Sequence, residues 1–311
     1  MTQHPGLLAG PLGFDDVGAL RHEDGRVTLH TVDFFPPMVD DPKSYGAVAA
    51  ANALSDIYAS GAKPSVVLNL AGFPEDWDDG TLAAVFAGAM EKVQESGALW
   101  IGGHTVKSAE PLFGFAVFGE LSSQEQLCTN SDAKVGDRLF LTKPLGTGVI
   151  VTSICKGTAE DSSVAAAIQS MIHLNADVLP AFQAGQVKAA TDITGFGLCG
   201  HAANLARASA VTLAIESNAL PLISGASDLA QTGVFSGAVS RGRENLNDCV
   251  SVAGNVPEWL SSICFDAETS GGILACVPSD HAQDFCAAFP SDNQPILVGK
   301  VEEGAGRVEL R

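Results

Sequence analysis

The chain is 311 residues long, and its 36 acidic and 17 basic side chains give a formal net charge of −19 at pH 7, which argues against nucleic acid and anionic lipid as partners. Hydrophobic residues make up 46% of the sequence, but apolar runs such as 149–154 are far shorter than the ~20 residues that cross a bilayer. We therefore expect a folded, soluble protein of about two domains, with no membrane helix and no nucleic-acid partner.

The start of the chain and its cysteines indicate the compartment. Residues 1–16, MTQHPGLLAGPLGFDD, lack the cationic start and the apolar core of a secretory signal, which predicts a cytoplasmic protein. Seven cysteines are scattered without any C-x-x-C pair, so neither a disulfide framework nor a thiolate zinc site is expected. Most of them are predicted to be small core residues.

The first elements place polar residues in apolar surroundings. Residues 26–35 alternate as a strand does, with Asp33 near the end. An alanine-rich helix follows at 49–60, and it carries Asn52 and Asp56 four positions apart, hence on one face. That face is either the solvent-exposed side of an amphipathic helix or a ligand-binding face, and this window does not decide between them.

The rest of the first half alternates strands and a helix. The expected elements are strands at 65–72, 98–101 and 112–121 and a helix at 81–97. Gly102–Thr105 (GGHT) is predicted to be a turn between the last two strands. The polar segment 122–134 is typical of a connector, so we expect domains at 1–122 and 134–311.

The second half has the same mixed character. Strands are expected at 138–142, 211–215, 272–277 and 295–301, and helical segments at 147–155, within 161–183, at 200–208, within 216–232 and at 281–288. Helices and strands in both halves predict an α+β protein with two mixed domains.

One glycine motif suggests a dinucleotide site. Gly195–Gly200 (GFGLCG) fits G-x-G-x-x-G, opens an expected helix, and has Glu216 after the next strand. Against this reading, 187–194 is a poor buried parallel strand and the fingerprint normally opens a domain. A dinucleotide oxidoreductase is therefore a remote alternative to glycines that simply allow a tight turn.

Carboxylates at the ends of elements indicate a metal-nucleotide site. The residues concerned are Asp15, Asp16, Asp33, Asp56 and Asp192. Mg²⁺ prefers oxygen ligands, so several scattered aspartates together with substrate phosphates are able to form one cluster, although each alone is more typical of a turn or a helix cap. No G-x-x-x-x-G-K-[ST] sequence occurs, so an ATP site in this chain is not a P-loop.

Seven segments occur in the order typical of one family of enzymes: DDVGAL at Asp15, TVDFFPPMVDDP at Thr31, ANALSDIYASGAKP at Ala51, GGHT at Gly102, LTKPLGTGV at Leu141, TDITGFGLCGH at Thr191 and ETSGGIL at Glu268. Together they resemble selenophosphate synthetase (selenide, water dikinase), of the aminoimidazole ribonucleotide synthetase-like superfamily. The resemblance extends from Asp15 almost to the C-terminus and places the glycine motif within this family's signature.

The resemblance implies an enzyme that converts ATP, selenide and water to AMP, selenophosphate and phosphate with Mg²⁺. It also implies a homodimer in which the N-terminal domains pair as a barrel, followed by a C-terminal α/β domain. By the same resemblance, Asp16, Asp56 and Asp192 are Mg²⁺ ligands, Asp15 and Asp33 contact the metal-nucleotide cluster, and Asn52, Gly103, His104 and Thr105 line the ATP site, the last three from the partner subunit.

The chain departs from the family pattern near its start. Family members carry a glycine-rich loop with a catalytic Cys or selenocysteine and a Lys ahead of the Asp-Asp motif, whereas the fourteen residues before Asp15 contain neither Cys nor Lys. We therefore assign no catalytic residue, and a Mg-ATP-binding paralogue without selenide chemistry is the alternative function. One hypothesis is that Met1 is an internal start after a UGA selenocysteine codon; another start site in a cysteine form, or a trimmed chain, gives the same sequence. Lys107 and Ala267 also replace an expected acidic residue and a usual proline.

Overall fold

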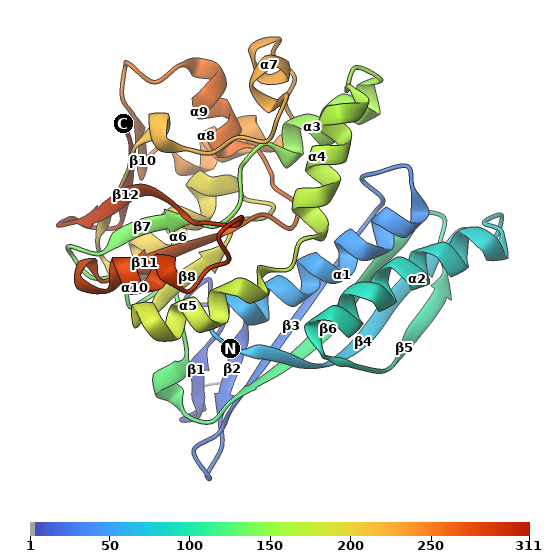
Figure 1. The fold of residues 1–311 in the computed structure, drawn as a ribbon, viewed down its shortest axis with the longest axis horizontal. Helices are drawn as coiled ribbons and strands as arrows, with labels where there is room; N and C mark the ends of the chain where they lie inside the picture. Colours follow the sequence, from blue (N-terminus) through green and yellow to red (C-terminus); the bar gives the residue numbers. More distant parts are fainter. Residues whose placement is uncertain (1–3) are drawn as a thin grey trace.

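The computed structural model describes residues 4–311, which form two sheets joined side by side (Figure 1). The N-terminal sheet has six strands in the order β1-β2-β3-β6-β4-β5 within this range. Their bounds are β1 Leu7–Ala9, β2 Gly18–Arg21, β3 Val27–Phe35, β4 Lys63–Phe73, β5 Leu99–Lys107 and β6 Leu112–Leu121. Neighbouring strands pair antiparallel except β4 and β5, which are parallel and are joined through a helix.

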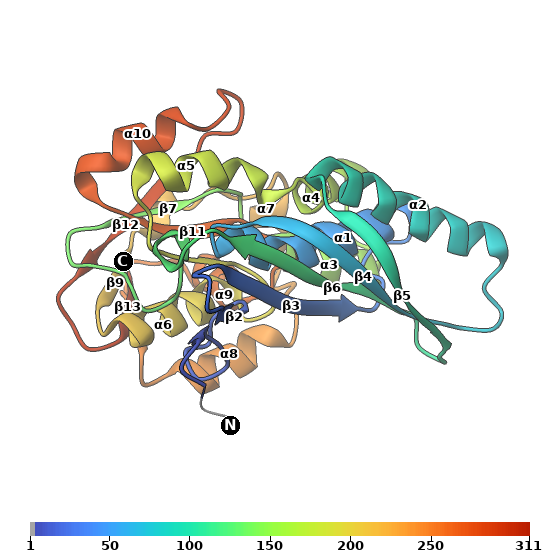
Figure 2. The same cartoon turned by 90° about the horizontal axis from the view of Figure 1, so that it is seen from below.

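Two long helices, α1 (Pro42–Ala59) and α2 (Asp79–Ser96), cover one face of this sheet, and Figure 2 shows both on the same side of β3, β6, β4 and β5. The carboxylate of Asp41 caps α1 by accepting from the Ser44 N–H at 2.8 Å. The helices cross very closely, because a Cβ at Gly46 would lie 1.8 Å from the Val85 carbonyl oxygen and one at Gly88 would lie 1.9 Å from the carbonyl oxygen of Lys43. Small residues thus allow the two backbones to touch.

The C-terminal domain is built on a second sheet, of seven strands within the described range, in the order β10-β13-β9-β12-β7-β11-β8. Their bounds are β7 Arg138–Leu141, β8 Ala189–Asp192, β9 Thr212–Ile215, β10 Val250–Val252, β11 Ile273–Val277, β12 Ile296–Glu302 and β13 Arg307–Leu310. Figure 2 shows the helices on both sides of this sheet. They are α5 Val178–Gly185 and α10 Ala282–Ala287 on one side and α6 Gly197–Ser209, α8 Ala238–Leu246 and α9 Glu258–Phe265 on the other.

Further helices lie in the C-terminal part of the chain. They are α3 Thr147–Lys156, α4 Asp161–Ile172 and α7 Ala226–Gln231, with short 3-10 turns at Gln124–Gln126, Asn175–Asp177, Ser217–Ala219 and Ser279–His281. One hydrophobic core continues from α1 through Met171 of α4 to Phe182 of α5. The Asn175 side-chain amide also donates to Ser55 Oγ at 2.9 Å, so α1 belongs to the interior of the whole molecule rather than to one domain.

The mixed α and β class and most expected elements are confirmed, but three expectations need correction. Gly102–Thr105 is not a turn, because the whole segment lies inside β5. The helices α8 and α9 and the short strands β1, β2, β10 and β13 were not predicted. Residues 189–192 do form a buried strand, and it pairs antiparallel with β11 rather than belonging to a parallel unit.

Two bulk expectations can be compared with the structure. Within residues 4–311, no helix combines the length and the apolar character needed to cross a membrane. All seven cysteines are free and five of them are buried, as expected for small core residues.

Candidate active site

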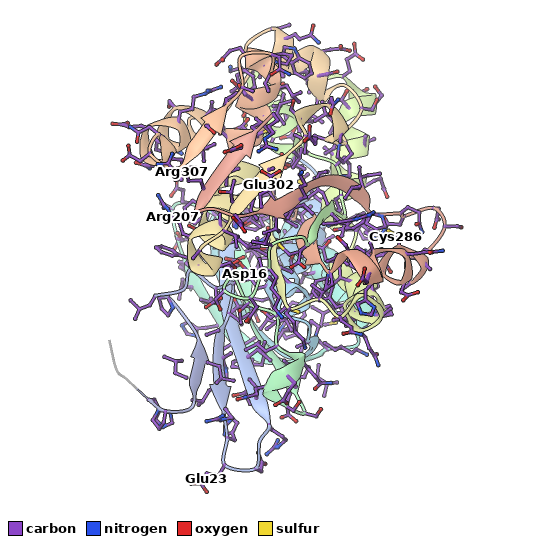
Figure 3. All side chains as sticks on the ribbon, turned by 90° about the vertical axis from the view of Figure 1, so that its left-hand side faces the viewer. Asp16, Glu23, Arg207, Cys286, Glu302 and Arg307 are labelled. Atoms are coloured by element: carbon purple, nitrogen blue, oxygen red, sulfur yellow. The ribbon has the colours of Figure 1, made fainter. Side chains whose placement is uncertain are left out.

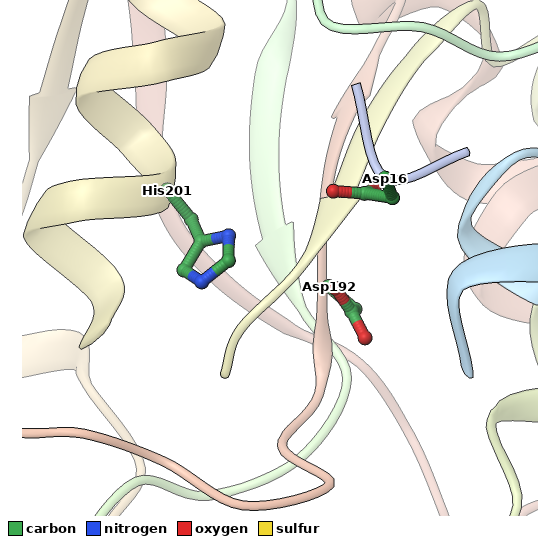
Figure 4. Close-up of side chains that lie close together, drawn as sticks. All are labelled: Asp16, Asp192 and His201. Atoms are coloured by element: carbon green, nitrogen blue, oxygen red, sulfur yellow. The ribbon is translucent and has the colours of Figure 1, made fainter. Parts of the chain in front are cut away.

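Four aspartates from four separate segments lie at the junction of the two domains. Asp16 lies just before β2, Asp33 near the end of β3, Asp56 in α1 and Asp192 at the end of β8. Figure 3 shows Asp16 in the middle of the molecule. Asp16, Asp192 and His201 each offer a ligand atom, and these atoms all lie within 4.8 Å of one another (Figure 4). The structure therefore brings together carboxylates that are up to 176 positions apart in the sequence.

The electrostatics of this cluster are unfavourable without a cation. Burial, and then the charge of neighbouring aspartates, raises the pKa of Asp16 and of Asp56 well above the usual value and that of Asp33 to about 7. Burial raises the pKa of Asp192 to about 6. Its Oδ2 atom is buried without a hydrogen-bond partner among the described residues. Crowded carboxylates with an unsatisfied buried oxygen form the donor set that suits a hard divalent cation such as Mg²⁺.

Hydrogen bonds from neutral side chains orient two of these carboxylates. Thr31 Oγ1 donates to Asp56 Oδ2, and Thr191 Oγ1 donates to Asp16 Oδ1 at 2.9 Å. Each hydroxyl group favours the charged form of the carboxylate that it contacts and fixes its direction. The carboxylate of Asp15 is held by a different segment, since it accepts from the Asn130 N–H at 3.0 Å.

Asn52 joins the cluster to the C-terminal domain. Its Nδ2 donates to Asp33 Oδ2 at 2.8 Å, and its Oδ1 accepts from the Ser270 N–H at 2.8 Å. Asn52 is 5% and Asp56 8% exposed, so the polar face of the alanine-rich helix is buried against other carboxylates and is not a solvent-facing side.

The sequence analysis did not single out His201, which lies in the first turns of α6. The Thr194 N–H donates to His201 Nε2 at 3.2 Å, so in the neutral ring the proton is on Nδ1, which lies 3.4 Å from Thr191 Oγ1. Burial lowers the pKa of His201 to about 4, so this neutral form is present at pH 7. His201 thus supports the hydroxyl group that orients Asp16. Its place in TDITGFGLCGH was the only signal of such a role.

Two further charged residues were also missed. Lys143 is buried, and its Nζ donates to the carbonyl oxygens of His173 and Ser270 at 2.6 and 2.8 Å. Burial lowers the pKa of Lys143 to about 7. Glu268 accepts from the Gly146 N–H at 2.7 Å and caps α3. Both residues lie in quoted motifs, LTKPLGTGV and ETSGGIL, but their burial is not readable from sequence.

Gly103, His104 and Thr105 lie outside the aspartate cluster of the same chain. Across the sheet, Asp33 of β3 lies opposite Phe115 of β6, and Phe115 lies opposite Asn69 of β4. Asn69 in turn lies opposite Gly103 of β5. Three strand spacings, or about 14 Å, therefore separate Asp33 from Gly103. His104 is exposed and lines an apolar hollow of about 210 Å³ with Phe34, so one chain alone does not bring the GGHT segment to the aspartates.

The uncovered face and edge of the N-terminal sheet are apolar. β5 is an edge strand, and its Leu99 and Ile101 are 65% and 64% exposed. On the same sheet Val32 and Phe34 are 52% and 50% exposed. An unpaired strand edge beside exposed large apolar side chains is typical of a protein–protein interface.

The glycine motif at Gly195 does not have the surroundings of a dinucleotide site. It follows β8, which lies at the edge of its sheet and pairs antiparallel with its neighbouring strand β11, whereas the dinucleotide fingerprint belongs to a parallel β-α-β unit. Gly197 has a φ of +68°, and a Cβ there would lie 2.4 Å from the Asp266 carbonyl oxygen. The glycine thus serves a tight turn with close backbone packing.

Comparisons with known proteins agree with these features. The family models described as AIR synthase related protein, N-terminal domain and C-terminal domain, match residues 14–121 and 134–311. The chain is 41% identical to selenide, water dikinase of Clostridioides difficile over 278 residues, covering 89% of this chain and 80% of that protein. It is 38% identical to the enzyme of that name from Myxococcus xanthus over 312 residues, covering 99% and 88% of the two chains.

Solved structures show the same fold in more distant proteins. Thiamine monophosphate kinase from Aquifex aeolicus superposes with a TM-score of 0.71 at 20% identity, covering 95% of this chain and 90% of that chain. The hydrogenase maturation protein HypE superposes with a TM-score of 0.68 at 17% identity, covering 98% and 90%. At such identities the likeness concerns the fold alone.

Proposed function

The chain belongs to the selenide, water dikinase family, and from this premise we propose that it transfers a phosphoryl group from ATP to selenide, yielding selenophosphate, AMP and phosphate. The observation that carries the proposal is the cluster of four aspartates at the domain junction, with its raised pKa values and the unpartnered Asp192 oxygen. Such a cluster suits metal-bound phosphates, whose positioning and charge neutralisation supply most of the catalysis in phosphoryl transfer.

We propose that Asp16, Asp56 and Asp192 hold Mg²⁺ and that Asp33 contacts the metal-nucleotide cluster. Mg²⁺, when bound, neutralises the charge of the triphosphate. The chain's own contribution is to hold the carboxylates in place, through Asn52 on Asp33 and through the threonine hydroxyl groups on Asp56 and Asp16. With a net charge of −19, the protein itself offers little positive charge to a polyphosphate, which supports a role for metal ions.

We further propose that two copies pair through the apolar face and the β5 edge of the N-terminal sheet. Exposed Leu99, Ile101, Val32 and Phe34 support this interface. The separation of Gly103 from Asp33 supports an arrangement in which Gly103, His104 and Thr105 line the ATP site of the partner subunit. The bounds of the two domains, 1–122 and 134–311, remain a prediction.

The test is selenide-dependent release of AMP. The protein is incubated anaerobically with MgATP, with and without selenide, and AMP is quantified by chromatography while selenophosphate is followed by ³¹P NMR. We expect AMP only when selenide is present, and we expect Asp56→Asn to lose it. Asp24→Asn is the matched control, because it removes an exposed carboxylate that pairs only with Arg26.

Three results would contradict the proposal. Saturable MgATP binding without AMP release would instead assign a nucleotide-binding paralogue without selenide chemistry. A saturable titration with NADH would revive the dinucleotide reading of the glycine motif. Equal AMP release with and without selenide would indicate a simple ATP-hydrolysing activity.

A further inference from the structure

A second cavity lies outside the aspartate cluster, in the C-terminal domain. It has a volume of about 340 Å³ and lies between α6, α8 and the segment before β2. Figure 2 shows α6 and α8 on the same side of the C-terminal sheet, next to the N-terminal segment. The side chains that matter for its chemistry are Phe14, Phe196, Asn204, Arg207, Arg241 and Asn245. We call this cavity the α6–α8 groove.

Two arginines of the groove have no counter-charge. Within residues 4–311, Arg207 and Arg241 form no ion pair and no side-chain hydrogen bond, and both are exposed. By contrast, Arg243 on the same helix pairs with Glu258 and covers the ring of Phe265. Two free guanidinium groups that line one hollow, in a chain of net charge −19, favour an anion with several oxygens, such as a phosphate.

Two phenylalanine rings also line the groove and remain in solvent. Phe14 is 58% and Phe196 67% exposed. Phe14 has a φ of +54°, which is uncommon for a bulky residue, and its carbonyl oxygen accepts from the side-chain amide of Asn130 at 2.7 Å. A hydrogen bond to a distant segment thus holds an aromatic residue in a costly conformation at the rim. Exposed aromatic faces in a hollow suit the stacking of a flat ring.

The remaining polar side chains complete this pattern. Asn204 and Asn245 each offer one amide donor pair and one acceptor, which suit the edge of a heteroaromatic base. The ring of Phe196 packs against His201 with centroids 5.6 Å apart, and His201 faces Thr191 on the aspartate side. The groove is therefore next to the aspartate cluster but separated from it by the His201 ring.

We propose that the α6–α8 groove binds a nucleoside monophosphate. Arg207 and Arg241 hold the phosphate, Phe14 and Phe196 lie against the base, and the two asparagines contact its edge. The volume of about 340 Å³ is in the range of small-molecule sites. The inference rests on the groove's own residues and does not depend on the dikinase reaction.

The test is calorimetric titration of the full chain with AMP, adenosine and inorganic phosphate in buffer with EDTA. We expect AMP to bind saturably and adenosine and phosphate to bind at least about tenfold more weakly, because each lacks half of the contacts. Arg207→Ala and Arg241→Ala each raise the AMP dissociation constant by about tenfold or more, the usual effect of losing a charge-assisted hydrogen bond. Phe196→Leu, which keeps an apolar side chain, weakens the binding of AMP and leaves the binding of inorganic phosphate unchanged.

Arg307→Ala is the matched control. Arg307 is exposed and also lacks an ion pair within the described part of the chain. Its neighbour Gly306 packs against Arg207, and Figure 3 labels both arginines. Arg307 is not among the residues that line the groove. We expect its AMP affinity to equal that of the unchanged protein. The proposal is overturned if AMP does not bind, if Arg207→Ala and Phe196→Leu both bind AMP normally, if Arg307→Ala weakens it as much as Arg207→Ala, or if phosphate binds as tightly as AMP.

Discussion

Replacing Asp33 with Asn should make the metal-free protein more stable at alkaline pH. Asp33 lies near the end of β3, where burial, and then the carboxylate of Asp192, raises its pKa to about 7. The folded protein therefore holds a proton that the unfolded chain, with a pKa near 3.8, has already released. Asn is neutral and still accepts the hydrogen bond that Asn52 donates at 2.8 Å.

The size and sign of the effect follow from this shift. A rise of about three pKa units corresponds to about 4 kcal/mol. Because the folded pKa is the higher one, the carboxylate costs nothing below pH 4, and its cost grows as the pH rises through 4 to 7. The free energy of unfolding of Asp33→Asn should therefore equal that of the unchanged protein at pH 4 and exceed it by up to about 4 kcal/mol at pH 8.

Urea unfolding in EDTA at a series of pH values measures this difference. Tryptophan fluorescence is a suitable signal, since Trp77 and Trp100 both lie in the N-terminal domain and Trp259 alone lies in the other. Asp24→Asn is the control, because hydrogen bonds from Arg26 lower the pKa of that exposed carboxyl and its removal gives no gain at pH 8. The reasoning would be refuted if the difference in unfolding free energy between Asp33→Asn and the unchanged protein did not change with pH. It would also be refuted if Asp33→Asn were less stable than the unchanged protein at pH 8.

Three further outcomes are expected. In thermal denaturation, MgCl₂ should raise the melting temperature of the Asp192→Asn variant much less than that of the unchanged protein, because the substitution removes the unpartnered carboxylate oxygen. An equal rise in melting temperature for both proteins would exclude this residue as a ligand. Ile101→Asp should elute as a monomer in size-exclusion chromatography with light scattering, because it charges an apolar edge strand; a dimer of unchanged stability would place the interface elsewhere. Gly103→Ala should lower the melting temperature, at a cost on the order of 2 kcal/mol, because its Cβ would lie 2.0 Å from Asn69 Oδ1; an unchanged melting temperature would contradict that contact.

The elements with strong periodicity were predictable from the sequence. The alternation in residues 26–35 gave β3, and the spacing of Asn52 and Asp56 correctly placed both on one face of α1. Periodicity does not tell how many layers cover a helix, however. The C-terminal domain buries the polar face of α1, and only the fold could distinguish this from an ordinary solvent-exposed face.

The GGHT segment shows why a local rule failed. Two adjacent glycines normally indicate a turn, yet Gly103 lies inside β5. A glycine is needed there because the side chain and carbonyl oxygen of Asn69 on β4 leave no room for a Cβ. The reason is a contact with a strand more than thirty positions earlier, which no window around the glycines contains. The short helix α8 was missed for a different reason, since SRGREN is polar and includes a glycine.

The candidate site could be predicted only in parts. Each aspartate alone is more typical of a turn or a cap than of a ligand, and the resemblance to a family, rather than spacing, joined Asp16 to Asp192. His201 and Lys143 were missed because their importance comes from burial: the pKa of each is lowered by its surroundings, not by any neighbour in sequence.

The close crossing of α1 and α2 limits how this sequence can change during evolution. Gly46 fits against Val85 and Gly88 against Lys43, each with backbone atoms where a Cβ would be. Replacing either glycine alone requires the helices to move apart, and α1 cannot shift without moving Asp56 and Asn52. A single substitution at either position therefore disturbs the crossing, so a lineage that widens it must alter the helix pair together with the face that carries Asn52 and Asp56.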